Sequence, residues 1–420
     1  MPIYWKSQIS DNAHTYKLDG QEWLLLISRS ASFEKGLPSL LNHFYPNAGR
    51  IITNPGSGLP ELHWNNQGAE LVVGEVGVSL GSLEYGLAED SLKKIMLPFP
   101  ADVTLSVQLL SFSCGSFSVV WWTNNLVADG NGVTMLIRRW SEFARTGTIT
   151  EEAPNFNRSV FRPCDPPSYS AKLGAMFATY DDHRLVNVLT AHDSFVERLY
   201  YVEASDIAWL REMASTESHR SSRVQAVSAY LWKVLADVVA TCRVPDEERC
   251  RMGWMVDGRR CRLSSSRPCA TTRATYALGD EAVEDIRRKS LAEVAATVRE
   301  AITSIDYDEY VQELIDWVEE HKTERMMETG VLGMGPPTGN QTVFASFPLD
   351  TDFGFGHAAL ALPMCDYGRL SSAYLSVGAR PGGDGSWIIS AYVWPRFAAA
   401  LESDKKRIFK PLTAEYLGLI

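Results

Sequence analysis

The segment 103–143 constrains the fold of this chain more than any other. Two runs of β-branched and aromatic residues, VTLSVQLLSFSC and FSVVWWT, are divided by Gly115-Ser116, which predicts an antiparallel hairpin. Turn-forming residues follow, and then a helical pattern whose apolar positions share one face: Val133, Leu136, Ile137, Trp140 and Phe143. Asn124 to Gly130 therefore form a strand-to-helix elbow in which Asp129 is a candidate N-cap. Strand ends of this kind are where α/β folds commonly bind ligands.

The rest of the chain alternates between strand and helix signals. A Pro-, Ser- and Asp-rich stretch over 148–193 is typical of a connector, and 420 residues suit two domains of roughly 150 residues or more. The pattern predicts two mixed α/β layers, each a sheet with helices on it. We expect strands at 22–28, 61–64, 69–75, 194–203, 342–349 and 359–364, helices at 34–43, 205–215, 224–235 and through 280–328, and a strand–helix pair at 387–404.

Composition and charge exclude several classes of protein. The net charge of −11, from 40 Lys+Arg against 51 Asp+Glu, repels phosphate backbones and anionic membrane surfaces. No apolar run approaches the ~18 residues of a membrane span, and the first residues resemble neither a secretory nor a transit signal. Seven scattered cysteines without a CxxC spacing and eight histidines without HExxH predict reduced thiols and no metal site. We therefore expect a cytoplasmic protein that binds no nucleic acid, membrane or metal.

Four ordered segments resemble one known family, the BAHD acyl-CoA-dependent acyltransferases. HFYPNAGR (43–50) is similar to the family's HFYPLAGR, NLVADG (125–130) stands where the family has HxxxDG, AYLWKVLADV (229–238) resembles AxLWK, and DFGFG (352–356) stands where the family has DFGWG. The resemblance implies an α/β fold of two chloramphenicol-acetyltransferase-like domains with a tunnel between them. It predicts an N-terminal domain over 1–165, a connector and crossover over 166–220, and a C-terminal domain over 221–420.

The position of the family's catalytic histidine holds an amide in this chain. In the family that histidine is the general base that takes a proton from the acceptor hydroxyl or amine, and the count back from Asp129 and Gly130 places Asn125 there. An amide has no useful basicity near pH 7, whereas a positioned base contributes about 10²–10⁴ in rate. Asn125 can still donate or accept a hydrogen bond, so it could hold a carbonyl or an enolate-like oxygen.

The resemblance also assigns roles around Asn125. Thr342, in TVFASFP, matches a family threonine that is a candidate oxyanion donor, although an ordinary strand residue explains it equally well. Asp129 should hold the elbow with Arg259 as its partner, or act only as an N-cap. Asn124, Trp122 and Thr123 could contact substrate in the tunnel, while strand alternation alone also explains Trp122.

The remaining matched residues are expected to be structural. The resemblance makes Asp352, Gly354 and Gly356 parts of a loop that is distant from the chemistry, with Phe355 in place of the family's tryptophan. We considered His357, His43 and His192 as replacement bases and favour none of them.

Three hypotheses of function remain open. The first is an enzyme of specialised metabolism that uses the tunnel for a cyclisation, rearrangement or elimination, reactions that need no histidine base. The second is an acyltransferase with non-standard catalysis, in which a nucleophilic amine needs little help and Asn125 only orients it. The third is a binding protein without catalysis. We predict a monomer that takes a small-molecule substrate and no cofactor, with acyl-CoA as co-substrate if acyl transfer is retained.

Overall fold

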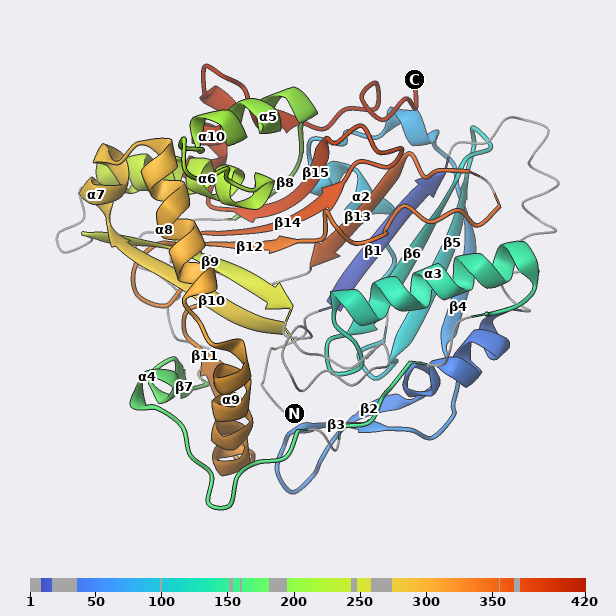
Figure 1. Ribbon diagram of the computed structural model, residues 1–420. Helices are drawn as coiled ribbons and strands as arrows, with labels where there is room; N and C mark the ends of the chain where they lie inside the picture. Colours follow the sequence, from blue (N-terminus) through green and yellow to red (C-terminus); the bar gives the residue numbers. More distant parts are fainter. Residues whose placement is uncertain are drawn as a thin grey trace.

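Two large β-sheets with their covering helices, together with two small two-stranded sheets, form the described part of the chain in the computed structural model (Figure 1). The structure describes residues 9–16, 36–98, 100–150, 154–158, 161–180, 195–242, 248–257, 274–354, 356–365 and 371–420. The strand predicted at 22–28 lies outside these residues. In the described part of the chain, no helix is both long and apolar enough to cross a membrane.

The first sheet contains the predicted hairpin and has the strand order β13-β1-β6-β5-β4. Its strands are β1 (Ile9–Tyr16), β4 (Glu70–Val76), β5 (Leu105–Phe112), β6 (Phe117–Asn124) and β13 (Leu360–Cys365). β5 and β6 pair antiparallel across a tight turn, which confirms the hairpin prediction. β13 comes from late in the chain and pairs antiparallel with β1, so the C-terminal half supplies an edge of this sheet.

Helix α3 (Gly130–Thr146) covers one face of the first sheet, as predicted. Its buried positions include Val133, Leu136, Ile137 and Trp140, and the Trp140 ring meets the Trp121 ring of β6 edge to face with centroids 6.5 Å apart. A fully buried tryptophan removes about 200 Å² from water, which contributes about 5 kcal/mol before the entropy of ordering is subtracted. This core fixes the elbow between β6 and α3.

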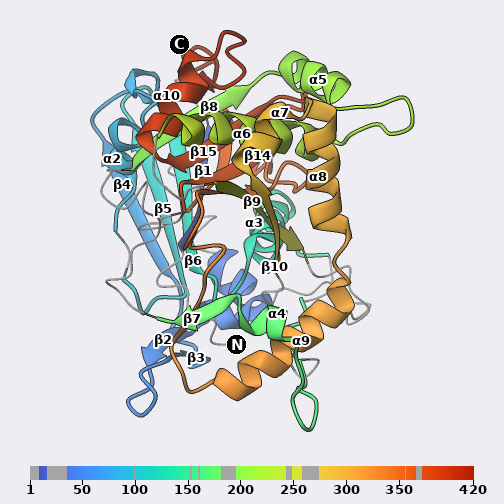
Figure 2. The same ribbon diagram turned by 90° about the vertical axis from the view of Figure 1, so that its left-hand side faces the viewer.

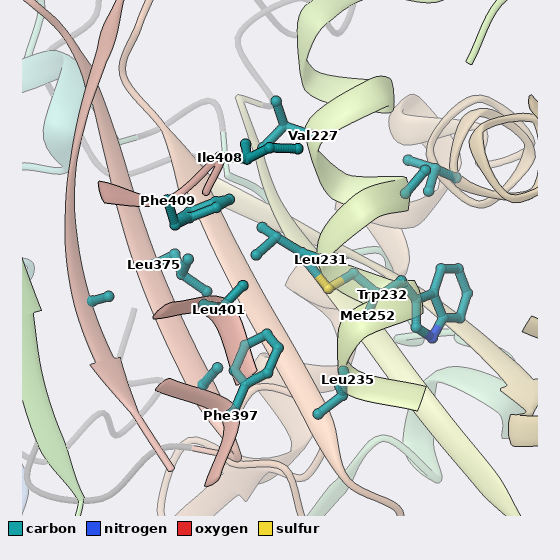
Figure 3. Close-up of a cluster of buried hydrophobic side chains, with 14 of the residues drawn as sticks. Val227, Leu231, Trp232, Leu235, Met252, Leu375, Phe397, Leu401, Ile408 and Phe409 are labelled. Atoms are coloured by element: carbon teal, nitrogen blue, oxygen red, sulfur yellow. The ribbon is translucent and has the colours of Figure 1, made fainter. Parts of the chain in front are cut away.

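The second sheet has the order β10-β9-β12-β14-β15-β8-β16. Its strands are β8 (Val196–Val202), β9 (Arg249–Asp257), β10 (Ala274–Ala282), β12 (Thr338–Val343), β14 (Ala373–Ala379), β15 (Trp387–Val393) and β16 (Lys410–Pro411). Helix α6 (Arg223–Thr241) starts with a Ser222–Gln225 capping box and packs on this sheet. In Figure 3, Leu231 and Leu235 of α6 point toward the side chains of α10 (Pro395–Ser403).

Shorter elements complete the molecule. Figures 1 and 2 show α9, α4 and β7 together at the end of the molecule opposite to α10. The elements are a helix over 36–43, η1 (Tyr45–Ala48), β2 (Arg50–Thr53), β3 (Pro60–His63), η2 (Leu80–Ser82), η3 (Ala88–Asp90), α2 (Leu92–Ile95), α4 (Ala171–Gly174), β7 (Phe177–Thr179), α5 (Ala204–Met213), α7 (Val283–Arg288), α8 (Leu291–Thr303), α9 (Tyr307–His321) and β11 (Met326–Glu328).

Two of the predicted elements, one strand and one helical stretch, have other bounds in the structure. The strand predicted at 342–349 lies earlier, at Thr338–Val343, and the helical stretch predicted from 280 begins with the end of β10 and then breaks into three helices. The pattern also missed β9 and β10, because Gly253 and Gly279 interrupt their apolar alternation. Gly253 is required there, since a Cβ at this position would lie 1.9 Å from Tyr276 Oη.

The two sheets meet where β13 lies beside β14. A Cβ on Gly378 of β14 would lie 3.4 Å from the carbonyl oxygen of Ala361 in β13. A hydrophobic cluster spans the same junction with residues of both sheets and of the C-terminal segment, among them Leu110, Phe112, Leu199, Ile388 and Leu412. The boundaries at 165 and 220 stay predictions; β8, inside the predicted connector, is a strand of the second sheet.

Candidate active site

The elbow after β6 is a tight turn that is closed by hydrogen bonds between its own residues. The Asn124 side chain accepts a hydrogen bond from Leu126 N at 2.9 Å, and the Asn124 carbonyl accepts one from Val127 N at 2.8 Å. Asp129 Oδ1 accepts from Gly132 N at 3.1 Å, which confirms Asp129 as the N-cap of α3. Asn125 lies half-buried at the start of this turn.

Two contacts join the elbow to the second sheet. Gly130, the first residue of α3, lies so close to Phe344 that a Cβ on Gly130 would be 2.1 Å from Phe344 Cε1. Asn131 Nδ2 donates to Asp257 Oδ2 at 3.4 Å. Because Asp257 ends β9 and Phe344 directly follows β12, the elbow lies against the ends of two neighbouring strands.

A third contact comes from the segment 154–158. Arg158 Nη2 donates to the carbonyl oxygen of Leu126 at 2.8 Å. Phe156 of the same segment is buried, and its ring packs edge to face against the rings of Phe44 and Tyr45. The residue after Asn125 is therefore held by a guanidinium.

Thr342 faces the side of the second sheet that is turned away from α6. Its neighbour Gln341 points to α6, where Gln341 Oε1 accepts a hydrogen bond from Ser228 at 2.5 Å, and side chains alternate along a strand. Thr342 is buried, and among the described residues its hydroxyl has no hydrogen-bond partner. Phe344 follows Thr342 by two positions, or about 7 Å along an extended chain. A hydroxyl able to donate to a ligand thus lies near the elbow.

The family follows from comparison with known proteins. The family model described as "Transferase family" matches residues 27–393, which is most of the chain. The chain belongs to this family, the BAHD acyltransferases.

Named relatives in plants are distant in sequence. An "Omega-hydroxypalmitate O-feruloyl transferase" of Arabidopsis thaliana is 23% identical over 82% of this chain and 76% of its own length. A "Putrescine hydroxycinnamoyltransferase" of Oryza sativa subsp. japonica is 24% identical over 79% of this chain and 78% of its own length.

Two crystal structures confirm the predicted fold class, an α/β fold of two chloramphenicol-acetyltransferase-like domains. TRI101 of F. graminearum in complex with coenzyme A and deoxynivalenol aligns with a TM-score of 0.78 at 16% identity, covering 96% of each chain. Vinorine synthase aligns with a TM-score of 0.69 at 19% identity, covering 100% of this chain and 92% of its own.

The residues predicted to contact substrate make mostly structural contacts in the described chain. The Thr123 hydroxyl donates to the Thr104 carbonyl at 3.0 Å, and the Asn124 amide closes the turn. Trp122 is buried with Val120 and Met96 on the face of the first sheet opposite to Trp121. Contacts of these three residues with substrate stay predictions.

The DFGFG loop of the family is built around Asp352. Asp352 Oδ1 accepts from Gly354 N at 2.6 Å and Gly356 N at 2.9 Å, and the positive φ angles of both glycines, 97° and 83°, favour residues without a Cβ. Asp352 also lies 3.8 Å from the guanidinium of Arg145. Arg145 is fifteen residues along α3 from Gly130, or about 22 Å, so these contacts support a structural role far from the elbow.

The three histidines considered as replacement bases lie in different parts of the chain. His357 follows the loop, is exposed, and pairs with Asp350 at 2.7 Å, so it belongs to the distant end of α3. His43 ends the helix over 36–43 and is half-buried. His192, Arg259 and Phe355 lie outside the described residues. In the described ranges, no three His, Cys, Asp or Glu side chains gather as a metal site would require.

One buried acid lies beside the second sheet. Burial raises the pKa of Glu328 to about 7, against the opposing effect of hydrogen bonds from Val331 N at 2.8 Å and Gly330 N at 3.1 Å. Beside it, Tyr276 Oη donates to Asn340 Oδ1 at 2.6 Å, and Asn340 Nδ2 donates to the Val331 carbonyl at 2.7 Å. These bonds hold the loop after β11 against the sheet.

Sequence reasoning found the elbow but missed its partners. Arg158, Phe344, Asn131 and Asp257 carried no signal as site residues, because each matters through a contact with a segment remote in sequence. The one available hint was that Asn131 directly follows the Asp129-Gly130 pair.

Proposed function

We propose that the chain transfers an acyl group from an acyl-CoA thioester to a nitrogen nucleophile, without a histidine base. The observation that carries the proposal is Asn125, an amide at the base position of the family, on an elbow that lies against the second sheet. Relatives named "Putrescine hydroxycinnamoyltransferase" and "Anthranilate N-benzoyltransferase protein 1" (Dianthus caryophyllus) support an amine acceptor. A neutral amine is nucleophilic by itself, whereas a hydroxyl needs a base to remove its proton.

The reaction then runs through a tetrahedral intermediate. The nitrogen lone pair attacks the thioester carbonyl carbon, the C–N bond forms, and the carbonyl electron pair moves to oxygen. The Thr342 hydroxyl donates a hydrogen bond to that oxygen. Asn125 Oδ1 accepts a hydrogen bond from an N–H of the acceptor and so orients the nitrogen. Collapse breaks the C–S bond; the coenzyme A thiolate leaves and takes a proton from solvent, while the nitrogen gives its proton to water.

The pH dependence follows from the acceptor rather than from the enzyme. An aliphatic amine with a pKa near that of lysine, about 10.4, is only about 0.1% neutral at pH 7.4. Without an enzyme base, kcat/KM for such an acceptor should rise about tenfold per pH unit up to the acceptor's own pKa. An aromatic amine, which is neutral at pH 7, should give a flat profile over the same range.

The test is release of coenzyme A by the purified protein, with products identified by mass spectrometry. Acetyl-, malonyl- and hydroxycinnamoyl-CoA are each paired with amines and with alcohols of matched carbon skeleton. We expect amide products with the unchanged protein, and Asn125→His should raise transfer to the alcohols by about tenfold or more. Asn54→Ala, in the remote turn between β2 and β3, is the control and should change neither rate. Absence of any amide product would refute the proposal.

A second candidate is the repurposed enzyme that carries out a cyclisation, rearrangement or elimination. The Asn125 side chain favours this candidate because an amide N–H can donate a hydrogen bond to an enolate-like oxygen. Such an enzyme would convert its substrate without releasing coenzyme A, and a ligand bound without turnover would instead indicate a binding protein. The named relatives are acyltransferases, which puts acyl transfer first.

The proposal needs acyl-CoA and a small acceptor as substrates and no cofactor. The crystal structures of TRI101 contain coenzyme A with deoxynivalenol or with T-2 mycotoxin, which supports this pair of ligand classes. The monomeric state and the cytoplasmic location stay predictions.

A further inference from the structure

Both backbone polar groups of Leu126 are held by side chains. Its N–H donates to Asn124 Oδ1 at 2.9 Å, and its carbonyl oxygen accepts from Arg158 Nη2 at 2.8 Å. Because peptide units are planar, fixing the N–H of Leu126 also fixes the carbonyl group of Asn125. The two residues that hold Leu126 therefore restrain the backbone on the C-terminal side of Asn125.

Asn124 and Arg158, which bond to the backbone of Leu126, belong to different parts of the chain. Asn124 belongs to β6 and moves with the elbow, whereas Arg158 is 32 residues from Leu126 in sequence. Arg158 follows Phe156, whose ring lies 6.2 Å from the Phe44 ring and 5.1 Å from the Tyr45 ring, centroid to centroid. Phe156 is buried, so the guanidinium extends from a packed platform rather than from a free loop.

A guanidinium suits this task better than other donors. Its charge makes the bond to a carbonyl oxygen stronger than one between neutral groups, and its planar fork restricts direction as well as distance. We expect that loss of the bond lets the backbone around Leu126 shift, and that the adjoining residue Asn125 shifts with it. Displacement of a reacting group by about 1 Å can reduce rate about a hundredfold.

We propose that Arg158 is a positioning residue, whose bond to the Leu126 carbonyl holds the elbow so that Asn125 meets the acceptor. The inference rests on the proposed function only for the identity of the reaction. The geometric part, that Arg158 sets the orientation of Asn125, stands apart from the identity of the substrate.

The experiment compares Arg158→Met, Arg158→Lys and a matched control, Arg211→Met. Arg211 Nε donates to the Ser221 carbonyl at 3.2 Å, so the control removes the same kind of bond at α5, outside the elbow. We expect Arg158→Met to lower kcat for amide formation by about tenfold to about a hundredfold with KM changed less than about threefold. Arg158→Lys retains a charged donor and should recover most of kcat, and Arg211→Met should leave both constants unchanged.

A loss of kcat in Arg158→Met no larger than in Arg211→Met would overturn the proposal. So would a change confined to KM, because that would place Arg158 in substrate binding instead. Arg158→Met and Arg211→Met should lower the free energy of unfolding in urea by similar amounts. A loss of kcat confined to Arg158→Met then reports positioning and not general destabilisation.

A second readout keeps the inference testable if the protein forms no amide with any donor. In protein labelled with ¹⁵N at asparagine side chains, the Asn125 NH₂ signal is identified by its loss in Asn125→Ser. We expect this signal to shift in Arg158→Met and to stay in place in Arg211→Met. An unmoved signal in Arg158→Met refutes the positioning role, whereas a shifted signal without transfer refutes only the proposed reaction.

Discussion

Substitution of Gly130 by alanine tests how the elbow is fixed against the second sheet. The added Cβ would lie 2.1 Å from Phe344 Cε1, 2.8 Å from Cζ and 3.2 Å from Cδ1. Non-bonded carbon atoms rest at about 3.5–4.0 Å, so the ring or the elbow must move by about 1.5 Å. Phe344 is not free to move, because its N–H donates to the Val377 carbonyl at 2.7 Å and its ring meets Phe347 edge to face.

The expected cost combines two opposing effects. Overpacking of this kind destabilises by about 1–3 kcal/mol, while exchange of glycine for alanine in a helix returns about 0.5–1 kcal/mol. Gly130→Ala should therefore lower the free energy of unfolding by about 1–2 kcal/mol. In Phe344→Ala the obstructing ring is gone, so the same substitution should cost nothing or stabilise slightly. The two changes should couple by about 1.5 kcal/mol.

The measurement is a double-mutant cycle in urea, followed by tryptophan fluorescence. Urea is preferred to heating because 1 kcal/mol shifts the melting temperature of a chain this long by only about 1 °C. Gly77→Ala is the matched control, since no atom lies within 4 Å of its would-be Cβ and its φ angle is negative or extended.

Additive effects of the two substitutions would contradict this account of the elbow. If Gly130→Ala costs the same with and without the Phe344 ring, the contact between them does not hold the elbow. A cost no larger than that of Gly77→Ala would lead to the same conclusion. In either case the join between elbow and second sheet would have to rest on other contacts, such as that of Asn131 with Asp257.

Three further predictions follow from single side chains. Asp129→Ala should lower the free energy of unfolding by about 1–2 kcal/mol through the lost N-cap, with Asp129→Asn as the conservative control; a variant that folds normally but is inactive would show that the role is not structural. Thr342→Val should lower kcat by about a hundredfold with unchanged stability, because its hydroxyl has no partner among the described residues, and unchanged turnover would remove Thr342 from the mechanism. The pKa of Glu328 is about 7 in the folded protein and 4.5 ordinarily, so the native state binds the Glu328 proton more tightly than the unfolded chain does. The contribution of protonated Glu328 to the free energy of unfolding is therefore fully present below pH 4.5 and is lost as pH rises through 7. Glu328→Gln should remove this loss of stability, which is about 2–3 kcal/mol between pH 5 and pH 8 and is measured by urea unfolding at the two pH values. An unchanged loss in the variant would assign the effect to another group.

The local elements of the site could be predicted because their causes are local. The hairpin over 105–124 follows from alternation and from Gly115-Ser116, and α3 starts where Asp129 caps it. The prediction that Asn125 occupies the family's base position needed only a count along NLVADG. Each of these inferences uses interactions that span a few residues.

Strand membership could not be predicted in the same way. β13 has the composition of a buried strand, but nothing in LALPMC says that it pairs with β1 in the first sheet. β9 and β10 were missed because Gly253 makes room for the Tyr276 side chain on the neighbouring strand, a demand that comes from packing.

From the amino-acid sequence we could infer the family and the elbow, and we could predict that an amide, Asn125, occupies the family's base position. Only the folded chain shows which distant groups contact the elbow: the guanidinium of Arg158 on the Leu126 carbonyl and the ring of Phe344 beside Gly130. The two kinds of feature depend on interactions of different sequence range. Turns and caps are set by neighbours along the chain, whereas these contacts exist only after burial of two separate cores has brought distant segments to the same place.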